Sequence, residues 1–306
     1  MKHIFILNPI AGSGFAKSLE RDIIDLAEKK NIDYILVKSE YEKHAIEIAK
    51  EYSVNNNHIY SIGGDGTAFE TLNGLDKEKA YFSIIPAGTG NDFYRMIDQE
   101  NTTIIKKIEE AIDGKVVEVD YGLSNGRCFL NSTTVGLDAR INNIVCNIFK
   151  KTIMPKSIMY GLASVFSLLN PKPFKAILKI SYEDENGQVI YKNNEIKSLL
   201  IAVMNGKYYG NGIKPSDRPN ITDGYFDILI VENMNIFKLF KLLPRFFKGD
   251  TENIVGLNIY KSKDVEIELD KEIDAQSDGE NFKTKYLKLQ MVHKGLRLIV
   301  PKKSKL

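Results

Sequence analysis

Gly63-Gly64-Asp65-Gly66-Thr67 decides the fold, because this turn joins a short apolar run to a segment that is compatible with a helix. The apolar run, Ile59 to Ile62, is typical of a buried parallel strand, and the helical segment extends from Ala68 to Leu75. Glycines without a Cβ let the backbone come close to a ligand, and the first N–H groups of a helix point at negative charge. The order of strand, glycine turn and helix therefore predicts a phosphate site.

Asp65 is unusual inside such a turn, since a bare carboxylate would repel phosphate. Its presence indicates a cation, and Mg²⁺ brought in with a nucleotide fits a site of carboxylate and phosphate oxygens. The alternative is a tight strand-to-helix turn whose aspartate is merely solvated.

The composition leaves the substrate open but excludes some classes of protein. The chain has 306 residues, enough for two domains, and its formal net charge of +2 on 27% charged residues argues against a nucleic-acid partner. Two cysteines and no secretory leader fit a reducing cytosol. No apolar run approaches the roughly 18 residues of a membrane span. We therefore expect a cytoplasmic protein, soluble or at most transiently peripheral to the membrane, and the sequence leaves a homodimer open.

Strands and helices alternate through residue 120. Besides the central strand, the pattern predicts strands at 4–7, 34–38, 81–85 and 116–120, and helices at 17–30, after 39–42 and at 104–112. Ser39-Glu40-Tyr41-Glu42 has the form of a capping box, so Ser39 is first of all a candidate helix cap.

The loop after the first strand resembles two known phosphate motifs but fits neither. Ala11 and Ala16 stand where a P-loop requires glycines, and Lys17 stands at the third glycine of the dinucleotide fingerprint. Neither a P-loop NTPase nor a Rossmann dehydrogenase is indicated, although backbone contacts to phosphate remain reasonable here.

A second loop rich in glycine and ending in acid, Pro86 to Arg95, follows the strand at 81–85. The carboxyl ends of parallel strands share one edge of a sheet, so Asp65 and Asp92 are expected to meet at one cation. Asp120, the last residue of the strand at 116–120, brings a third carboxylate.

The pattern changes after residue 121 to short strands separated by turns, which predicts a β-rich second domain, a sandwich. Apolar and acidic residues alternate at 265–269, and Asp184 to Gly187 is a hairpin turn. A helix is predicted at 157–169. Another at 236–247 carries three basic residues, with a fourth, Lys248, directly after it, and is expected to pack on the sandwich, with a membrane-surface contact as the alternative. The predicted strands are 127–133, 176–182, 189–191, 196–204, 225–232, 264–269 and 286–292.

Two acidic turns in this half are candidate sites. Asp223-Gly224 joins a loop to a strand, and such a pair is usually only a turn. Asp278-Gly279-Glu280 places two carboxylates across a glycine, which suits a base held by a tight turn and a second acid that orients it.

Six motifs carry a resemblance that covers nearly the whole chain: Asn8-Pro9 with Gly12, Gly63 to Thr67, Pro86-x-Gly88-Thr89-x-Asn91-Asp92-Phe93-x-Arg95, Val135 to Ala139, Asp223 to Asp227 and Asp278-Gly279-Glu280. In order and spacing they are similar to the diacylglycerol kinase and lipid kinase family of bacteria. The resemblance implies an amino-terminal nucleotide-binding α/β domain at 1–122, to which 294–306 return, and a carboxyl-terminal β-sandwich domain for the lipid at 123–293.

The same resemblance implies a kinase that uses ATP and Mg²⁺ to phosphorylate a membrane lipid, with diacylglycerol, giving phosphatidic acid, as the leading substrate. Asp278 is implied to be the base, with Glu280 beside it and the two roles exchangeable. The implied ATP contacts are Asn8, Pro9, Ile10, Ala11, Gly12, Ser39, Gly63, Gly64, Asp65, Gly66, Thr67, Ala68, Phe69, Glu70, Thr89 and Asn91.

Two magnesium sites are also implied by the resemblance. Asp65, Asp92 and Asp120 would hold the catalytic ion. Asp223, with the backbone carbonyls of Asn220 and Tyr225, would hold a structural ion.

Phe69 departs from the family pattern, which has asparagine at this position before Glu70, so one polar contact to the nucleotide is in doubt. Two alternatives stay open. An NAD kinase shares Gly-Gly-Asp-Gly but lacks the block at 88–95 and the late Asp-Gly-Glu, and a catalytically inactive lipid- or nucleotide-binding protein would account for Phe69.

Overall fold

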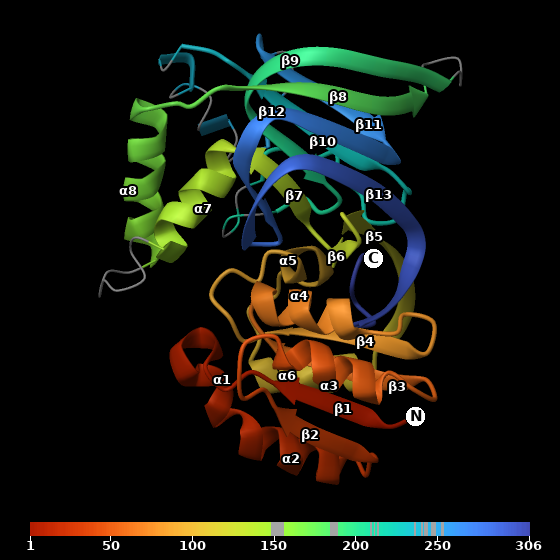
Figure 1. Ribbon diagram of the computed structural model, residues 1–306. Coiled ribbons are helices and arrows are strands. Elements are labelled where there is room, and N and C mark those ends of the chain that lie inside the picture. The colour runs from red at the N-terminus through yellow and green to blue at the C-terminus, as the bar shows by residue number, and fades with distance from the viewer. Residues whose placement is uncertain are drawn as a thin grey trace. The chain divides into compact units, whose positions relative to one another are not determined.

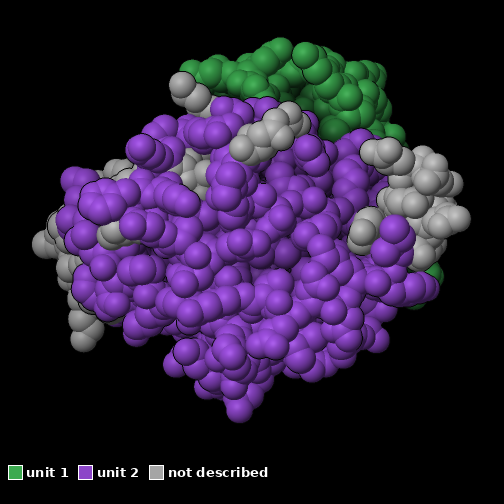
Figure 2. Space-filling view, turned by 90° about the horizontal axis from the view of Figure 1, so that it is seen from above, with its two compact units in different colours: residues 1–121, 208–212, 293–306 green, residues 122–207, 213–292 purple. Residues whose placement is uncertain are grey.

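The structure is a computed structural model (Figure 1), and it divides into two compact units, which Figure 2 shows in different colours. The first unit comprises residues 1–121, 208–212 and 293–306, and the second comprises 122–207 and 213–292. The sequence places its boundaries after residues 122 and 293, and it gives no sign that 208–212 join the first unit. The residues described are 1–147, 156–183, 189–208, 210, 212, 214–235, 237–239, 241, 244–245, 249–251 and 254–306.

The first unit contains a parallel sheet with the strand order β2, β1, β3, β4. These strands are β1 (His3–Leu7), β2 (Tyr34–Lys38), β3 (Asn57–Gly63) and β4 (Ala80–Pro86). The carboxyl-terminal part of β13 (Glu280–Val300) adds to β4 in parallel through Leu298 and Phe82. β5 (Lys115–Ser124) also pairs with β13.

Helices cover both faces of this sheet, which explains why β1 and β3 are buried at every position. Alternate side chains such as Phe5 and Tyr60 pack against α2 and α6 in one core that includes Ile23 and Ile108. α3 and α4 pack on each other and contact β3. The helices are η1 (Ala11–Gly14), α1 (Phe15–Ser18), α2 (Glu20–Lys29), α3 (His44–Tyr52), α4 (Asp65–Gly74), α5 (Tyr94–Ile97) and α6 (Ile104–Ile112). The predicted nucleotide-binding type of α/β architecture is confirmed, with the helix predicted at 17–30 divided into α1 and α2.

The capping box predicted at Ser39 is wrong. α3 begins at His44, and its N-cap is Lys43, which has a φ of 70° and whose N–H donates to Glu70 Oε1 at 3.0 Å. Ser39 instead follows β2, and its N–H donates to Leu7 O at 2.9 Å. The helix start is thus set by a carboxylate from α4, which local sequence spacing could not reveal.

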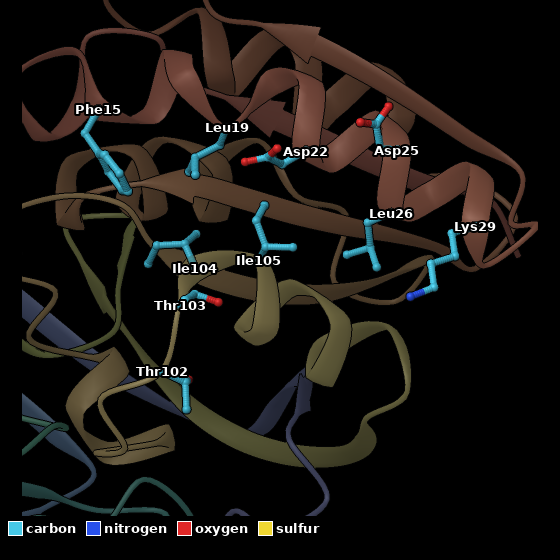
Figure 3. Close-up of a pocket in the computed structure, with 10 residues that line it drawn as sticks. All are labelled: Phe15, Leu19, Asp22, Asp25, Leu26, Lys29, Thr102, Thr103, Ile104 and Ile105. Carbon is cyan, nitrogen blue, oxygen red and sulfur yellow. The ribbon is translucent and has the colours of Figure 1, made fainter.

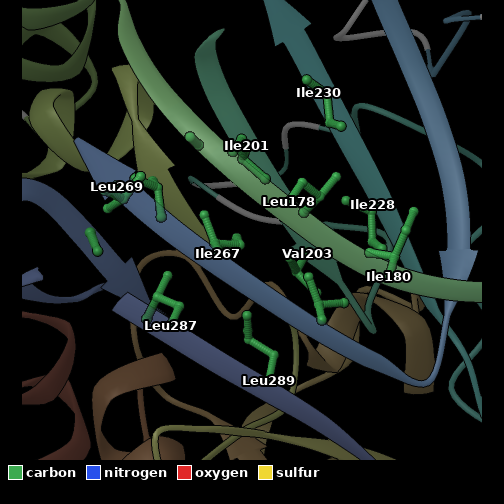
Figure 4. Packing of buried hydrophobic residues seen from close by; sticks show 14 of the residues in the cluster. Leu178, Ile180, Ile201, Val203, Ile228, Ile230, Ile267, Leu269, Leu287 and Leu289 are labelled. Carbon is green, nitrogen blue, oxygen red and sulfur yellow. The ribbon is translucent and has the colours of Figure 1, made fainter. Parts of the chain in front are cut away.

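The second unit is built on antiparallel strands that curl over one apolar core (Figure 4). Two long strands make the curl possible. β9 and β12 each pair with β8 through one half and with β7 through the other, and a register shift between Glu268 and Ile273 bends β12. The strands are β6 (Arg127–Phe129), β7 (Ser132–Gly136), β8 (Phe174–Glu183), β9 (Val189–Met204), β10 (Phe226–Glu232), β11 (Leu257–Ser262), β12 (Asp264–Ser277) and the first part of β13.

The predicted alternation in β12 is confirmed. Val265 and Ile267 are buried, whereas Glu266 and Glu268 lie on the other face and both pair with Lys179 of β8. The strands predicted at 189–191 and 196–204 are one strand, and β11 was not predicted. The hairpin turn predicted at 184–187 lies outside the described residues. Of the helix predicted at 236–247, the structure describes helical backbone at 237–239, 241 and 244–245.

Two helices belong to this unit, α7 (Leu137–Asn147), which was not predicted, and α8 (Lys156–Leu169), which was. Gly161 lies inside α8, and a Cβ built on it would have no neighbour within 4 Å among the described residues. The Gly161→Ala variant is therefore expected to raise the free energy of unfolding by about 0.5–1 kcal/mol, because alanine loses less backbone entropy in a helix. Chemical denaturation followed by circular dichroism would measure the gain, and a lower stability would contradict it.

Candidate active site

Three loops of the first unit meet at the carboxyl ends of β1, β3 and β4, and hydrogen bonds join them. Asn8 Nδ2 donates to Thr67 Oγ1 at 2.9 Å, and the Asn8 N–H donates to Ile62 O at 3.0 Å. The Ala87 N–H donates to Gly63 O at 2.8 Å. This is the edge of an open α/β sheet where ligands bind.

Glycines let the three loops approach one another backbone to backbone. An ideal Cβ on Gly88 would overlap Gly64 Cα and lie 2.9 Å from Gly64 N, and one on Gly12, whose φ is +60°, would lie 2.5 Å from Ala87 O. On Gly63 it would lie 2.6 Å from Thr67 Cβ. α4 begins directly behind this contact with Gly64 as its N-cap, so its first N–H groups face the loops.

Asp65 fixes the third loop to the second. Its Oδ2 accepts the Asn91 N–H and its Oδ1 accepts the Asp92 N–H, both at 2.8 Å. Burial, followed by the charge of Asp92, raises the pKa of Asp65 to about 6. The alternative of a merely solvated aspartate is wrong.

Asp92 is buried and lies near Asp65. An ideal Cβ on Gly90 would be 2.6 Å from Asp65 Oδ2 and 3.9 Å from Asp92 Oδ2. Asp92 Oδ1 accepts the Gly212 N–H at 2.7 Å and lies 3.6 Å from Arg95 Nε. The structure thus brings together the two carboxylates that the strand order predicted to meet.

Asp120 has different partners. Its buried Oδ1 lies 2.9 Å from His293 Nδ1 and accepts the Lys294 N–H at 2.7 Å. Within the described part of the chain, no three His, Cys, Asp or Glu side chains gather in an arrangement that could hold a metal ion. The metal role assigned to Asp120 stays a prediction.

Other expected nucleotide contacts have structural roles that the sequence did not show. Glu70 accepts the Lys43 N–H, as described above, and Phe69 is a buried side chain of α4. Asn91, with a φ of 53°, closes its own loop, because its side-chain amide donates to Gly88 O at 2.9 Å and its Oδ1 accepts the Gly88 N–H at 3.2 Å. Ile10 and Thr89 are exposed beside these loops.

Figure 3 shows a pocket of about 720 Å³ elsewhere in the first unit, where α1 and α2 face the start of α6. Apolar side chains such as Phe15, Leu26 and Ile105 line it, with Asp22 and Asp25 on the α2 side. None of its lining residues belongs to the predicted site. The joined loops, rather than this pocket, define the candidate site of the first unit.

In the second unit, Asp278 anchors a strand connection through its carboxylate. Oδ2 accepts the Leu130 N–H at 2.6 Å, and Oδ1 accepts the N–H groups of Asn131 and Ser132 at 2.9 and 3.0 Å. Asp278 itself has a φ of 46° in the turn between β12 and β13. Both oxygens of this carboxylate are therefore held by backbone donors.

Glu280 lies on the other side of Gly279 and is exposed as the first residue of β13. The turn between the two acids is held from both sides. The Gly279 N–H donates to Gln276 Oε1 at 2.6 Å, and Asn142 Nδ2 of α7 donates to Gly279 O at 2.7 Å. An accessible carboxylate on a fixed turn suits a proton acceptor better than one with three N–H donors.

Asp138 was part of a quoted motif without an assigned role, and the structure connects it to this turn. Gln276, whose Oε1 holds Gly279, donates through Nε2 to Asp138 Oδ2 at 3.3 Å, and Asp138 Oδ1 accepts the Ala139 N–H at 2.7 Å. Burial raises the pKa of Asp138 to about 6.

The Asp138→Asn variant is expected to change how stability depends on pH. The pKa of the folded state, about 6, lies above the ordinary 3.8, so the folded protein holds this proton more tightly than the unfolded chain. The stabilisation of the folded state by protonated Asp138 is full below pH 3.8 and is lost as the pH rises through 6. The variant should therefore gain up to about 3 kcal/mol relative to the native chain above pH 6 but not below 3.8. Urea unfolding across this range measures the difference, and equal pH profiles would contradict the assignment.

The loop at 220–225 was predicted to hold a structural Mg²⁺. Asp223 Oδ1 accepts the Tyr225 N–H at 3.1 Å, and its Oδ2 accepts a hydrogen bond from Lys261 Nζ at 2.6 Å. The Asp223 N–H faces Asn220 O at 3.4 Å. The three predicted ligands are thus neighbours, with the Lys261 ammonium on the carboxylate.

Asp227 was quoted within the same motif but not proposed as a ligand. It is 1% exposed at the start of β10, and neither carboxylate oxygen has a hydrogen-bond partner among the described residues. Burial, opposed by the charge of Lys261, raises its pKa to about 6. A buried carboxylate with open lone pairs beside Asp223 is a donor set that fits a hard cation. The sequence signal was a lone acid in an otherwise apolar strand.

Two family models match the chain and together span most of it. The diacylglycerol kinase catalytic domain matches residues 2–124, and the YegS C-terminal NAD kinase beta sandwich-like domain matches 131–300. YtlR of Bacillus subtilis, provisionally named a lipid kinase, is 28% identical over 97% of this chain and 99% of its own. A diacylglycerol kinase of Staphylococcus saprophyticus is 26% identical over 90% of this chain and 87% of its own.

A solved structure agrees with these matches. The crystal structure of a provisionally named diacylglycerol kinase from Bacillus anthracis superposes with a TM-score of 0.79 at 25% identity, covering 98% of this chain and 95% of that one. None of the helices described here is long and apolar enough to cross a bilayer.

The two units, the loops and these matches define a lipid kinase, a phosphotransferase. The chain belongs to the diacylglycerol kinase family. Membership implies ATP as the phosphoryl donor and a lipid as the acceptor.

Proposed function

We propose that this protein transfers the γ-phosphate of ATP to the free hydroxyl of diacylglycerol and so forms phosphatidic acid. One observation in the first unit carries the proposal. The glycine loops after β1, β3 and β4 are joined by hydrogen bonds, and the carboxylates of Asp65 and Asp92 in these loops are neighbours. Backbone N–H groups at such loops and at the start of α4 bind phosphate oxygens.

The loops supply the proposed nucleotide contacts. Asn8 and Thr67 hold the first two loops together. The Asp65 carboxylate positions the third loop by accepting the backbone N–H groups of Asn91 and Asp92. Mg²⁺, bound with the nucleotide near Asp65 and Asp92, would neutralise phosphate charge there, and Asp120 is kept as an outer member of this site. A second Mg²⁺ is proposed at Asn220, Asp223 and Tyr225, with Asp227 added as a ligand candidate.

The proposed acceptor of the proton is Glu280, with Asp278 as a positioning residue. The lipid hydroxyl oxygen forms a bond to the γ-phosphorus, and the bond from that phosphorus to the bridging oxygen of ADP breaks. The hydroxyl proton passes to the Glu280 carboxylate, and ADP leaves with the electron pair of the broken bond. Phosphoryl transfer needs little more from the protein than positioning, charge neutralisation and this acceptor.

The names of the relatives support diacylglycerol as the acceptor, since several are diacylglycerol kinases. The test is ATP turnover by the purified protein with Mg²⁺ and, in parallel, diacylglycerol in mixed micelles, sphingosine, phosphatidylglycerol and NAD. We expect the phosphate of ATP to appear on diacylglycerol. Phosphate on another lipid alone would show that the proposed substrate is wrong, and phosphate on NAD alone would show that the protein is not a lipid kinase. Phosphate on none of the acceptors would favour an inactive binding protein.

A further inference from the structure

The turn that leads into Glu280, the proposed proton acceptor, is a two-residue hairpin turn between β12 and β13. Ser277 pairs with Glu280 across it, and the two residues between them, Asp278 and Gly279, have φ of 46° and 91°. Positive φ at both central positions gives a turn whose twist matches the strands, and Asp-Gly is one of the pairs that favour it. The sequence of the turn is thus enough to close the hairpin, yet side chains outside the turn also bind it.

One side-chain amide on α7 binds both neighbours of Glu280. Asn142 Nδ2 donates to Gly279 O at 2.7 Å and to Asn281 Oδ1 at 3.0 Å. Gly279 O belongs to the peptide group that precedes Glu280, and Asn281 is the next residue along β13. The two hydrogen bonds therefore hold the chain on both sides of the residue that is proposed to accept the proton.

The orientation of this amide is fixed by α8. The Tyr160 hydroxyl oxygen lies 2.7 Å from Asn142 Oδ1, and Cys146 Sγ of α7 lies 3.7 Å from the same oxygen. A carbonyl oxygen such as Gly279 O can only accept, so the NH₂ group of Asn142 must face the turn and the tyrosine hydroxyl must donate. A flipped amide would set oxygen against oxygen at Gly279.

α7 and α8 pack on each other within the second unit and support the amide (Figure 1). Met159, Ala163 and Val145 are buried together between the two helices. Tyr160 packs against this cluster, and the Asn142 side chain is itself buried. The amide thus reaches the turn from a packed helix pair, which holds a side chain more precisely than a loop does.

We propose that Asn142 is a positioning residue for phosphoryl transfer, which holds Glu280 where the lipid hydroxyl can give up its proton, and that Tyr160 keeps the amide in the orientation that does so. The inference rests on the proposed function, in which Glu280 accepts that proton. Loss of the amide should leave the hairpin closed but let the peptide group before Glu280 rotate. Misplacement of a reacting group by about 1 Å can lower a rate by about 100-fold.

Asn142→Ala and Asn143→Ala form a matched pair of variants. Asn143, the next residue on α7, donates through Nδ2 to Asp274 Oδ1 of β12 at 3.1 Å, so its loss also removes a contact between α7 and β12 but leaves the turn alone. Both variants should melt below the native protein. Only Asn142→Ala should lower kcat, by about 10- to 100-fold, while the KM for Mg·ATP stays within about twofold. A native kcat in folded Asn142→Ala, or an equal loss in Asn143→Ala, overturns the inference.

A double-mutant cycle tests whether Asn142 acts through Glu280. In the Glu280→Gln background, Asn142→Ala should cause no further loss of kcat, because the carboxylate that it positions is already gone. Losses that multiply would assign Asn142 a structural role alone and overturn the inference. If Asn142→Ala does not fold, Asn142→Asp keeps the size of the side chain and the oxygen that faces Tyr160 but loses the NH₂ donors, and the same criteria apply to it.

Tyr160→Phe removes only the hydroxyl group that orients the amide. Its kcat should fall between those of the native protein and Asn142→Ala, because the amide can still bind the turn in one of its two orientations. A native kcat in this variant would overturn the part assigned to Tyr160.

Hydrogen exchange separates this inference from the proposed function. Exchange of the backbone amides at 277–282, followed by mass spectrometry, should be faster in Asn142→Ala and native in Asn143→Ala, whether or not the protein phosphorylates a lipid. Unchanged exchange in Asn142→Ala overturns the positioning role and leaves the kinase proposal standing. Faster exchange in a protein that phosphorylates none of the acceptors would refute the kinase proposal and support the hold of Asn142 on the turn.

Discussion

Turnover by the Glu280→Gln variant is expected to fall by about 10²–10⁴-fold, the usual effect of removing a general base. Glu280 is exposed at the first position of β13, so the isosteric amide should leave the melting temperature unchanged. ATP affinity should stay within about twofold because the loops of the first unit are not touched. Steady-state kinetics, titration calorimetry with Mg·ATP and scanning calorimetry give the three quantities.

Asp278→Asn is the matched comparison, and its expected phenotype is different. Both oxygens of Asp278 accept backbone N–H groups, so an NH₂ group at either position faces at least one donor from Leu130, Asn131 or Ser132. We expect a loss of about 2 kcal/mol of stability, with turnover lowered because the turn shifts. A stable, inactive Asp278→Asn variant beside a Glu280→Gln variant of near-native rate would return the role of base to Asp278.

Gly88→Ala is expected to cost about 3 kcal/mol of stability and to weaken Mg·ATP binding by more than about tenfold. Real Cβ atoms essentially never approach another heavy atom within 3.0 Å, and here the new methyl group would overlap Gly64 Cα and lie 2.9 Å from Gly64 N. Backbone cannot rotate away as a side chain can, so one of the two loops must shift. The phosphate contacts proposed for them shift with it.

Gly161→Ala serves as the control for this substitution, because a methyl group there meets open space. Calorimetric titration with Mg·ATP should give a native dissociation constant for Gly161→Ala and a much weaker one for Gly88→Ala. Native affinity in a folded Gly88→Ala protein would show that these loops do not bind the phosphates.

Much of the first unit could be predicted because its signals are local. Apolar runs between helical patterns mark parallel strands, and parallel strands bring their carboxyl ends to one edge. That rule is sufficient to place Asp65 near Asp92, although the two residues are 27 positions apart in the sequence. The hydrogen bond between them is seen only in the structure.

The roles of individual acids could not be predicted, because each depends on a partner far away in the sequence. The donors that occupy Asp278 come from residues almost 150 positions earlier, and the Lys43 N–H that holds Glu70 caps another helix. Asp227 is visible in the sequence as a lone acid in an apolar strand, but the structure is needed to show that it is buried with no hydrogen-bond partner among the described residues. A motif therefore identifies which side chains are present, whereas their chemistry depends on what the fold brings to them.

The long strand β13 makes the first unit discontinuous in the chain, and this affects the order in which the protein is made. Ser83 Oγ donates to Ile299 O across 216 positions, and Ser304 Oγ donates to Ile97 O across 207. On the ribosome, the β4 edge must therefore wait, unpaired, until the whole second unit has been synthesised. Until residues 293–306 emerge, that open edge is a template for pairing with other chains, so we expect the nascent chain to be prone to aggregation for as long as the second unit is being made.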